Sequence, residues 1–466
     1  MFAALNSFLT GGVSEAKDPY WANVSMLLHG DGTNAAQNNT FLDGSTNNFT
    51  VTRNGNTTQG SFNPFVSTYP YVVATNGGSG YFDGTGDYLT VPDSTAFTLG
   101  TNDFTIECWV NFTTLANSPV FSAQMNSAAS VLSFSFTMNT TGRLTTAVQD
   151  SSSAYKTINS TVGAILIDTW YHVALVRDGN TNRQYINGVQ TGSVSVTGFT
   201  VRDSTDVLGI GCGGAYNASQ LMTGYISNFR LVNGTCLYPS GTTFTPPTAP
   251  LTAVTNTSLL LGMSNGAIYD NAMLNNLETV ANAQISTSVF KYGTGSVALN
   301  GTTDYLNTSP ANQAAFAFGS GDFTIEMWVY TTSVAGASTL YGSYPNAVNG
   351  FYPSIFLLFG QVLFTTNGIA VISGATLSTN TWYHVAVARS GTSTKMFLNG
   401  TQTGSTYTDS NVYLNASLRP FIGMDSYNPG TNFFPGYIDD LRVTKGIARY
   451  TTTFTPPTAA FPNSGP

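Results

Sequence analysis

The sequence predicts an all-β protein made of two tandem antiparallel jelly-roll β-sandwiches, with a short N-terminal peptide. Three observations support this prediction. The stretch TWYHVALVRDG at 169–179 returns as TWYHVAVARSG at 381–391, so the chain is duplicated. Only 8% of residues are charged, and aromatic residues reach 13%. Short alternating segments end in Asn-Gly or Asp-Gly, which favours strands joined by tight turns.

The duplication covers nearly the whole chain. GTNDFTIECWV at 100–110 recurs as GSGDFTIEMWV at 319–329, and GYISNFRLVNG at 224–234 recurs as GYIDDLRVTKG at 436–446. The order of the motifs is conserved and their spacing drifts by only a few residues. We therefore expect an N-terminal docking or assembly peptide at 1–20, a first jelly roll at 21–250 and a second at 251–466.

The local pattern within each repeat is that of a β-meander. In DFTIECWV, four side chains fall on one face of a strand: Phe104, Ile106, Cys108 and Val110. Thr105, Glu107 and Trp109 fall on the other face. A strand at 170–177 is followed by a turn and then by a hairpin at Asn187-Gly188. Many short strands with regular turns indicate a sandwich of jelly-roll type.

The charge of the chain and the length of its apolar segments limit the kinds of partner that it is expected to bind. The net charge is −8, from 23 acidic and 15 basic residues, and the chain contains no basic run. Sequence-independent nucleic-acid binding therefore has little electrostatic support. No apolar segment reaches the ~20 residues of a membrane span, so no membrane partner is expected. The three cysteines align with Met327, Met424 and Ala448, which favours free thiols over a metal site.

The ordered motifs resemble the laminin-G-like, concanavalin A-like jelly-roll superfamily. The resemblance rests on FDGTGDYLTVP, NDFTIECWV, WYHVALVRDG with YINGVQ, and GYISNFRLVNG, and the second repeat matches through its own copies. It spans about residues 25–460. The superfamily includes lectins, glycosidases, adhesion modules and structural domains, so the fold alone does not give the function.

Catalysis is not expected. A glycosidase needs two carboxylates across one bond, about 5–9.5 Å apart. The chain has four glutamates, of which only Glu107 and Glu326 are equivalent, and Asp103 lies roughly 13 Å from Glu107 along an extended strand. We expect this repeated Glu to pair with an arginine, either Arg177 and Arg389 or Arg230 and Arg442. His172 and His384 lose their neighbouring acids between repeats, so we interpret them as half-buried core imidazoles.

Two kinds of binding site remain open. The superfamily resemblance implies a rim calcium, which prefers oxygen ligands, and the candidate ligands are Asp43, Asp270, Asp439 and Asp440. Calcium is optional here, and no cofactor is required. Exposed aromatic side chains stack on sugars, and the candidate glycan contacts are Trp109, Trp328 and Tyr216. Turn-forming roles explain the same aspartates equally well.

The N-terminus has no counterpart in the second repeat. Phe2, Leu5, Phe8 and Leu9 give it an apolar face, and it lacks the basic region of a signal peptide. We expect it to dock on another protein. The first ~65 residues resemble structural proteins of tailed bacteriophages from aquatic, especially cyanobacterial, hosts. This resemblance implies a virion-surface component, such as a capsid decoration, fibre or appendage subunit.

The leading hypothesis is therefore a non-catalytic virion-surface protein. Its partners would be other virion proteins, bound through the N-terminal peptide in an oligomeric or arrayed form, and host-surface glycans as an open further ligand. A receptor-binding lectin or polysaccharide depolymerase is the alternative, and a secreted bacterial adhesin is a second alternative.

Overall fold

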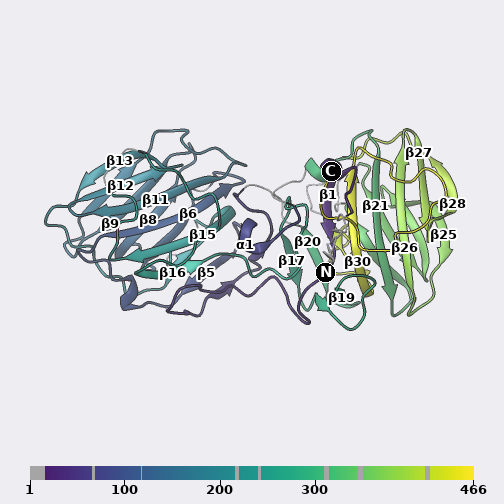
Figure 1. Ribbon diagram of the computed structural model, residues 1–466, viewed down its shortest axis with the longest axis horizontal. Coiled ribbons are helices and arrows are strands. Elements are labelled where there is room, and N and C mark those ends of the chain that lie inside the picture. The colour runs from purple at the N-terminus through teal and green to yellow at the C-terminus, as the bar shows by residue number, and fades with distance from the viewer. Residues whose placement is uncertain are drawn as a thin grey trace, which may run out of the picture.

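The computed structural model describes residues 16–65, 69–116, 118–215, 220–239, 243–308, 314–344, 350–414 and 420–466. It consists of two antiparallel β-sandwiches that lie side by side along the long axis of the molecule (Figure 1). The predicted all-β class and the two tandem jelly rolls are confirmed. The short helical elements of the described residues include η1 (Trp21–Asn23), α1 (Val73–Asn76) and η2 (Thr95–Phe97). None of the helices in the described part of the chain is long and apolar enough to cross a membrane.

The first sandwich pairs an eight-stranded with a seven-stranded sheet. In spatial order, the eight-stranded sheet contains β13 (Val189–Ser195), β12 (Thr181–Ile186), β11 (Tyr171–Asp178), β6 (Phe104–Phe112), β15 (Thr223–Asn233), β4 (Ser79–Asp83) and β3 (Thr58–Gly60), with β16 (Thr257–Leu261) also on β15. The seven-stranded sheet contains β10 (Tyr155–Asn159), β9 (Leu144–Gln149), β8 (Leu132–Met138), β7 (Val120–Met125), β14 (Leu208–Ile210), β5 (Tyr88–Val91) and β2 (Thr52–Asn54).

The second sandwich repeats this arrangement strand for strand. Its eight-stranded sheet contains β18 (Gln284–Ser286), β19 (Ser296–Asn300), β30 (Pro435–Lys445), β21 (Phe323–Thr331), β26 (Trp382–Ser390), β27 (Ser393–Leu398) and β28 (Thr401–Thr408), with β1 (Val24–Leu28) also on β30. Its seven-stranded sheet contains β17 (Leu277–Val280), β20 (Tyr305–Thr308), β29 (Phe421–Ile422), β22 (Ala337–Gly342), β23 (Pro353–Leu358), β24 (Gln361–Thr366) and β25 (Ile369–Thr376).

The two sandwiches exchange their first strands. β1 begins the first repeat but pairs with β30 of the second sandwich, beside which it lies in Figure 1. β16 begins the second repeat but pairs with β15 of the first sandwich. Met26 and Leu28 accordingly belong to the second core, whereas Leu259 and Leu261 belong to the first. The predicted ranges 21–250 and 251–466 follow the sequence repeat, but neither range supplies all the strands of one sandwich.

The exchange makes the chain cross twice between the sandwiches. One crossing follows β1 and the other follows β16, and buried Asn38 on the first crossing binds the second. Its Oδ1 accepts N–H bonds from Ala267 and Ile268 at 2.6 and 2.8 Å. Its amide donates to the carbonyl of Leu277 at 2.7 Å, within the second sandwich. Because an unpaired buried amide is costly, these bonds hold the two crossings together.

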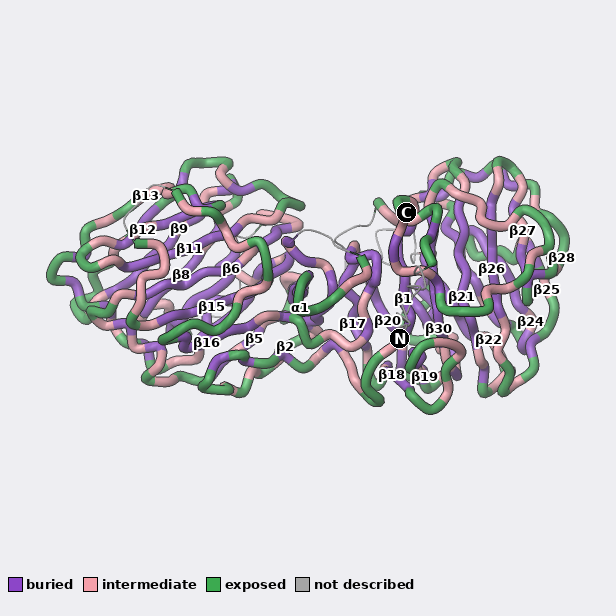
Figure 2. The backbone as a smooth tube through the Cα atoms, viewed as in Figure 1, coloured by how far each residue is buried: buried purple, intermediate pink, exposed green. Residues whose placement is uncertain are grey.

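Each sandwich has its own apolar core between its sheets, seen as the buried central strands in Figure 2. The predicted core face of β6 is confirmed, since Phe104, Ile106, Cys108 and Val110 are all in the first core. The hairpin predicted at Asn187-Gly188 is also confirmed. Both residues have left-handed backbones, with φ of 48° and 75°, as a two-residue turn between twisted strands requires.

The outer face of each eight-stranded sheet is covered by the segment that follows its longest strand. In the first sandwich Tyr238 and Phe244 stack with ring centroids 3.7 Å apart and pack on Tyr185. Tyr450 and Phe454 stack in the same way in the second, at 3.6 Å. The sequence TFTPPTA, which occurs at 243–249 and again at 453–459, therefore belongs to the covering segment and serves packing.

Candidate functional site

Glu107 lies at the centre of a buried polar network under the covering segment of the first sandwich. Its Oε1 accepts a hydrogen bond from Arg230 Nε at 2.9 Å, and its Oε2 accepts one from Tyr238 at 2.6 Å. His172 Nε2 lies 2.9 Å from Oε2. Nη1 of Arg230 donates a hydrogen bond to the backbone carbonyl of Thr252 at 2.8 Å. The predicted pairing of the repeated glutamate with an arginine is confirmed, and the partner is Arg230.

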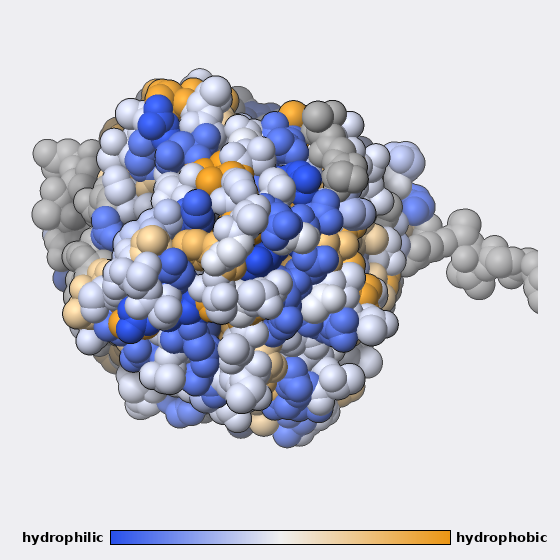
Figure 3. Space-filling model, turned by 90° about the vertical axis from the view of Figure 1, so that its left-hand side faces the viewer, coloured by the Kyte–Doolittle hydropathy of each residue, from blue (hydrophilic) through white to orange (hydrophobic). Residues whose placement is uncertain are grey.

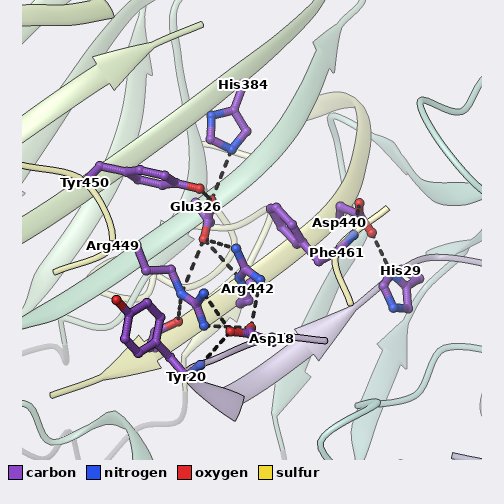
Figure 4. A network of polar contacts seen from close by, with 11 residues as sticks. Asp18, Tyr20, His29, Glu326, His384, Asp440, Arg442, Arg449, Tyr450 and Phe461 are labelled. Atoms are coloured by element: carbon purple, nitrogen blue, oxygen red, sulfur yellow. Dashed lines mark hydrogen bonds and ion pairs between the residues drawn. The ribbon is translucent and has the colours of Figure 1, made fainter. Parts of the chain in front are cut away.

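The second sandwich contains the same network with two additional charges (Figure 4). Glu326 accepts from Arg442 at 3.0 and 2.7 Å and from Tyr450 at 2.7 Å. Asp18, from the segment before β1, accepts from Arg442 at 2.9 Å. Arg449 donates to both oxygens of Asp18, at 3.0 and 2.8 Å. Asp18 therefore takes the place of the Thr252 carbonyl and brings the N-terminal segment onto β30.

Both networks keep their glutamate ionised. Burial alone would raise the pKa of Glu107, but the His172 contact and Arg230 outweigh it and lower the pKa. The same balance, with Arg442 as the main opposing charge, lowers the pKa of Glu326 to about 2. Both histidines have no exposed surface, so the expectation of half-buried imidazoles is corrected. The covering segment excludes water from them. A buried, salt-bridged carboxylate has no access to a substrate.

The proposed calcium ligands do not form one site. Asp43 accepts N–H bonds from Ser45, Phe49 and Leu260 in the first sandwich. Asp270 in the second accepts from Leu27, at 2.9 Å, and from the turn that follows it. These carboxylates therefore bind the exchanged strands to their new sandwiches. Within the described ranges no three His, Cys, Asp or Glu side chains are grouped to hold a metal.

Asp439 and Asp440 lie at a β-bulge of β30, where Asp440 has a left-handed φ of 47°. Asp439 accepts from the backbone N–H groups of Lys291 and Tyr292 at 2.7 and 3.0 Å. Burial, with Asp440 as an adjacent like charge, raises the pKa of Asp439 to about 7. Asp440 contacts His29 and accepts from the Phe461 N–H at 2.9 Å. N–H donors and a histidine do not fit a calcium ion, which needs several free oxygen ligands.

The proposed glycan contacts are placed differently from expectation. Trp328 is 5% exposed, and Lys291 lies over its ring at 4.2 Å, so it offers no free face to a sugar. Trp109 is half-buried against Phe65 and His172. The prediction for these two rings is corrected, because strand burial and neighbouring side chains occupy them. Tyr216 and the anchoring residues Phe2, Leu5, Phe8 and Leu9 lie outside the described residues.

A groove of about 490 Å³ lies on the outer face of the seven-stranded sheet of the second sandwich. Its wall contains Tyr344 and Tyr427, whose rings stack with centroids 4.9 Å apart and planes 6° apart. Tyr344 donates a hydrogen bond to Asn367 at 2.9 Å, and Tyr427 is 39% exposed. The floor includes Phe356 of β23. Sequence reasoning missed this groove because its aromatic residues lie on separate strands and loops.

The first sandwich has no such tyrosine pair at the equivalent positions. When the paired registers are continued by equal numbers of residues beyond the strands, Tyr344 aligns with Met125 and Tyr427 aligns with Ala215. They likewise align Phe356 with Thr137, and Leu363 with Thr145. The same framework therefore folds without these aromatic and apolar side chains. The groove is an addition to the fold rather than a requirement of it.

A second hollow, of about 590 Å³, lies where the two crossings meet. Most of its polar side chains bind one another or nearby backbone. Asn265 donates to the Thr40 carbonyl at 2.8 Å, and Asp31 accepts from Thr294 Oγ1 at 3.0 Å. Gln37 donates to the carbonyl of Ala283 at 2.9 Å. These contacts indicate that the hollow is a by-product of joining the sandwiches.

The chain belongs to the concanavalin A-like lectin/glucanases superfamily. The laminin-G-type family model of this superfamily matches residues 83–237 and 300–447, which together make up more than half of the chain. The resemblance noted in the sequence is thereby confirmed at the level of the superfamily. No curated protein is significantly similar to the chain in sequence.

Solved structures that are similar to this chain include domains LG4-5 of the mouse laminin α1 chain. They are 14% identical, with a TM-score of 0.29, and the match covers 87% of this chain and 97% of that one. The binding domain of botulinum neurotoxin serotype G is 11% identical, with a TM-score of 0.34 and coverages of 92% and 100%. Domain 4 of the Geobacillus stearothermophilus arabinanase AbnA, in complex with arabinotriose, is 18% identical, with a TM-score of 0.27 and coverages of 36% and 76%.

Proposed function

We propose that this chain is a non-catalytic surface protein that presents two joined sandwiches for assembly and for adhesion to a glycan-bearing surface. The observation that carries the proposal is the use of the acids shared by both repeats. Glu107 and Glu326 are salt-bridged in the interior, and Asp43 and Asp270 hold backbone N–H groups. Shared acids that are used in this way support packing and are themselves not free to act as the paired carboxylates of a hydrolase.

The remaining shared acids are occupied in the same way. Asp87 and Asp304 accept backbone N–H bonds from Asn56 and Asn282. Asp103 accepts from the Gly179 N–H at 2.7 Å, and its counterpart Asp322 accepts from another turn glycine at 2.7 Å. These bonds fix the turns at the ends of strands. They support a structural role for the recurring residues.

The outer surface suits a packed or adhesive component. Apolar residues are scattered among neutral and polar ones over the end of the first sandwich (Figure 3). With 8% charged residues, contacts made by such a surface would depend little on salt. The resemblance of residues 1–65 to tailed-phage structural proteins favours a virion surface as the location. The N-terminal peptide is the proposed contact with other virion proteins.

Two measurements test this proposal separately. If the chain is a virion protein, mass spectrometry of purified phage particles that encode it should find the chain in stoichiometric amount. Absence of the chain from these particles would contradict the virion role. Incubation of the full chain with polysaccharides should release no new reducing ends. Release of new reducing ends by the purified wild-type chain would instead establish a hydrolase.

A further inference from the structure

We infer that the groove at Tyr344 and Tyr427 is a binding site for neutral saccharide chains, which makes the second sandwich the adhesive one. The inference rests on the proposed function and specifies its ligand class and location. The groove lies on the seven-stranded sheet whose edge strand, β25, is at the end of the molecule away from the first sandwich (Figure 1). A large ligand therefore has access to it.

The tyrosine pair supplies the stacking surface. Tyr352 is buried and lies 5.6 Å from Tyr344, whose other close ring is the exposed Tyr427. A ring anchored by its neighbours loses little conformational freedom on binding. A pyranose ring presents a face of C–H groups, which suits an aromatic face, and hydroxyls around its rim. Aromatic side chains in a concave site with a few polar groups are typical of small-molecule recognition.

Polar groups line the same groove beside the tyrosine pair. Asn367 and Asn428 carry amides, and Thr365 carries a hydroxyl. Asn367 accepts the Tyr344 hydroxyl through Oδ1, so its NH₂ group remains as a donor. Leu358, which is 42% exposed, and Phe356 provide apolar contact between these polar groups. This alternation matches a chain of sugar units better than a uniformly apolar ligand.

The charge of the groove selects neutral ligands. No Lys or Arg is among the described residues that line it, and its one ionisable acid is Asp425. Asp425 accepts from the Tyr427 N–H and from Asn432, both at 2.9 Å, so it positions the loop that carries Tyr427. A buried carboxylate without a cation beside the ligand disfavours uronic or sialic acids.

The comparison between sandwiches supports recognition over folding as the role of these side chains. The first sandwich carries Met125 and Ala215 in place of the tyrosines and Thr137 in place of Phe356. Exposed aromatic residues that the fold does not need lower solubility, so they are expected where they bind something.

Affinity gel electrophoresis of the full chain tests the inference. The gels contain dextran, yeast mannan, arabinoxylan or β-1,3-glucan as neutral polymers, and alginate or hyaluronan as acidic ones. We expect at least one neutral polymer to retard the wild-type chain and the acidic polymers to leave it unretarded. The variant Tyr344→Met/Tyr427→Ala inserts the residues of the first sandwich, and we expect it to lose roughly tenfold or more in affinity.

Two controls keep the test decisive. Tyr155→Ala removes a tyrosine that is 49% exposed on β10 of the first sandwich, and it should leave retardation unchanged. Tyr427→Phe retains the stacking ring and should retain most of the affinity. Full retardation of the double variant would overturn the groove as the site while leaving the adhesive function standing. Retardation by acidic polymers alone, or by no neutral polymer, would overturn the ligand class, and particle composition would still test the surface role.

Discussion

The two sandwiches share one framework but differ in what has been added to it. Both bury a Glu–Arg–Tyr–His network under an aromatic covering segment. Only the second adds Asp18 and Arg449 to that network and places two tyrosines on its open sheet. The shared parts therefore specify the fold, and the added parts close the chain and form the proposed binding groove.

The exchanged strands explain why the second network is larger. β16 reaches the first sandwich through a covalent connection from β15, because the two are consecutive in sequence. β1 and β30 lie at opposite ends of the sequence, so their pairing must close a long loop. The ion pairs of Asp18 with Arg442 and Arg449 lie where that closure occurs. The added charges thus act as a clasp between the two ends of the described chain.

The largest effect on this comparison is expected from deletion of residues 1–28. It removes Val24, Met26, Leu27 and Leu28, all at most 4% exposed, at about 1.5–3 kcal/mol each. Their sum is comparable with the whole stability of a typical domain, about 5–15 kcal/mol. Hydrogen exchange should show β30 losing protection while β15 retains it. Deletion of residues 1–15 keeps β1 and Asp18 and is the matched control; equal protection of β30 in both deletions would contradict the exchange.

The next largest effect is a difference in the free energy of unfolding between variants of the two buried networks. Glu107→Gln leaves Arg230 buried without a carboxylate, and we expect a loss of about 3–5 kcal/mol in the free energy of unfolding. Glu326→Gln leaves Arg442 paired with Asp18, so the loss should be smaller. Urea unfolding of both variants gives the comparison. Equal losses would show that Asp18 does not compensate.

A smaller effect is expected at the β-bulge, where the first sandwich has Ser227-Asn228 and the second has Asp439-Asp440. The pKa of Asp439 is raised to about 7, so its folded form binds a proton more tightly than the unfolded chain. Ionisation of Asp439 therefore destabilises the fold as pH rises from about 4 to 7, and the penalty is complete above 7. Asp439→Asn should raise the melting temperature at pH 8 and change it little at pH 4. A gain that is equal at both pH values would rule out this titration.

The smallest effect is expected from calcium. Because Asp43 and Asp270 use their oxygens on backbone N–H groups, a change from EDTA to millimolar calcium should shift the melting temperature by less than about 1 °C. Elemental analysis of calcium-reloaded protein provides the independent measurement. Stoichiometric retained calcium would show that these turns rearrange around an ion.

The sequence alone determined the fold class, the duplication and the structural use of the repeated motifs. Alternation in DFTIECWV and the Asn-Gly turn at 187–188 are local signals, because strand periodicity and turn chemistry act over a few residues. The arginine partner of Glu107 was also anticipated as one of two choices. Because the same motifs occur in both repeats, a role in packing was the simpler explanation for their residues.

Tertiary structure decided the rest. β1 and β16 have similar apolar sequences, so either core would accept either strand and the sequence does not say which sandwich each one completes. The strand exchange depends instead on the two crossings and on the ion pairs of Asp18 with Arg442 and Arg449. Trp328 was expected at the surface because its strand position faces away from the core, but Lys291 comes from a distant segment to cover it. The groove likewise depends on Tyr344 and Tyr427, which are far apart in sequence and meet only because β22 and β29 are neighbours in the sheet.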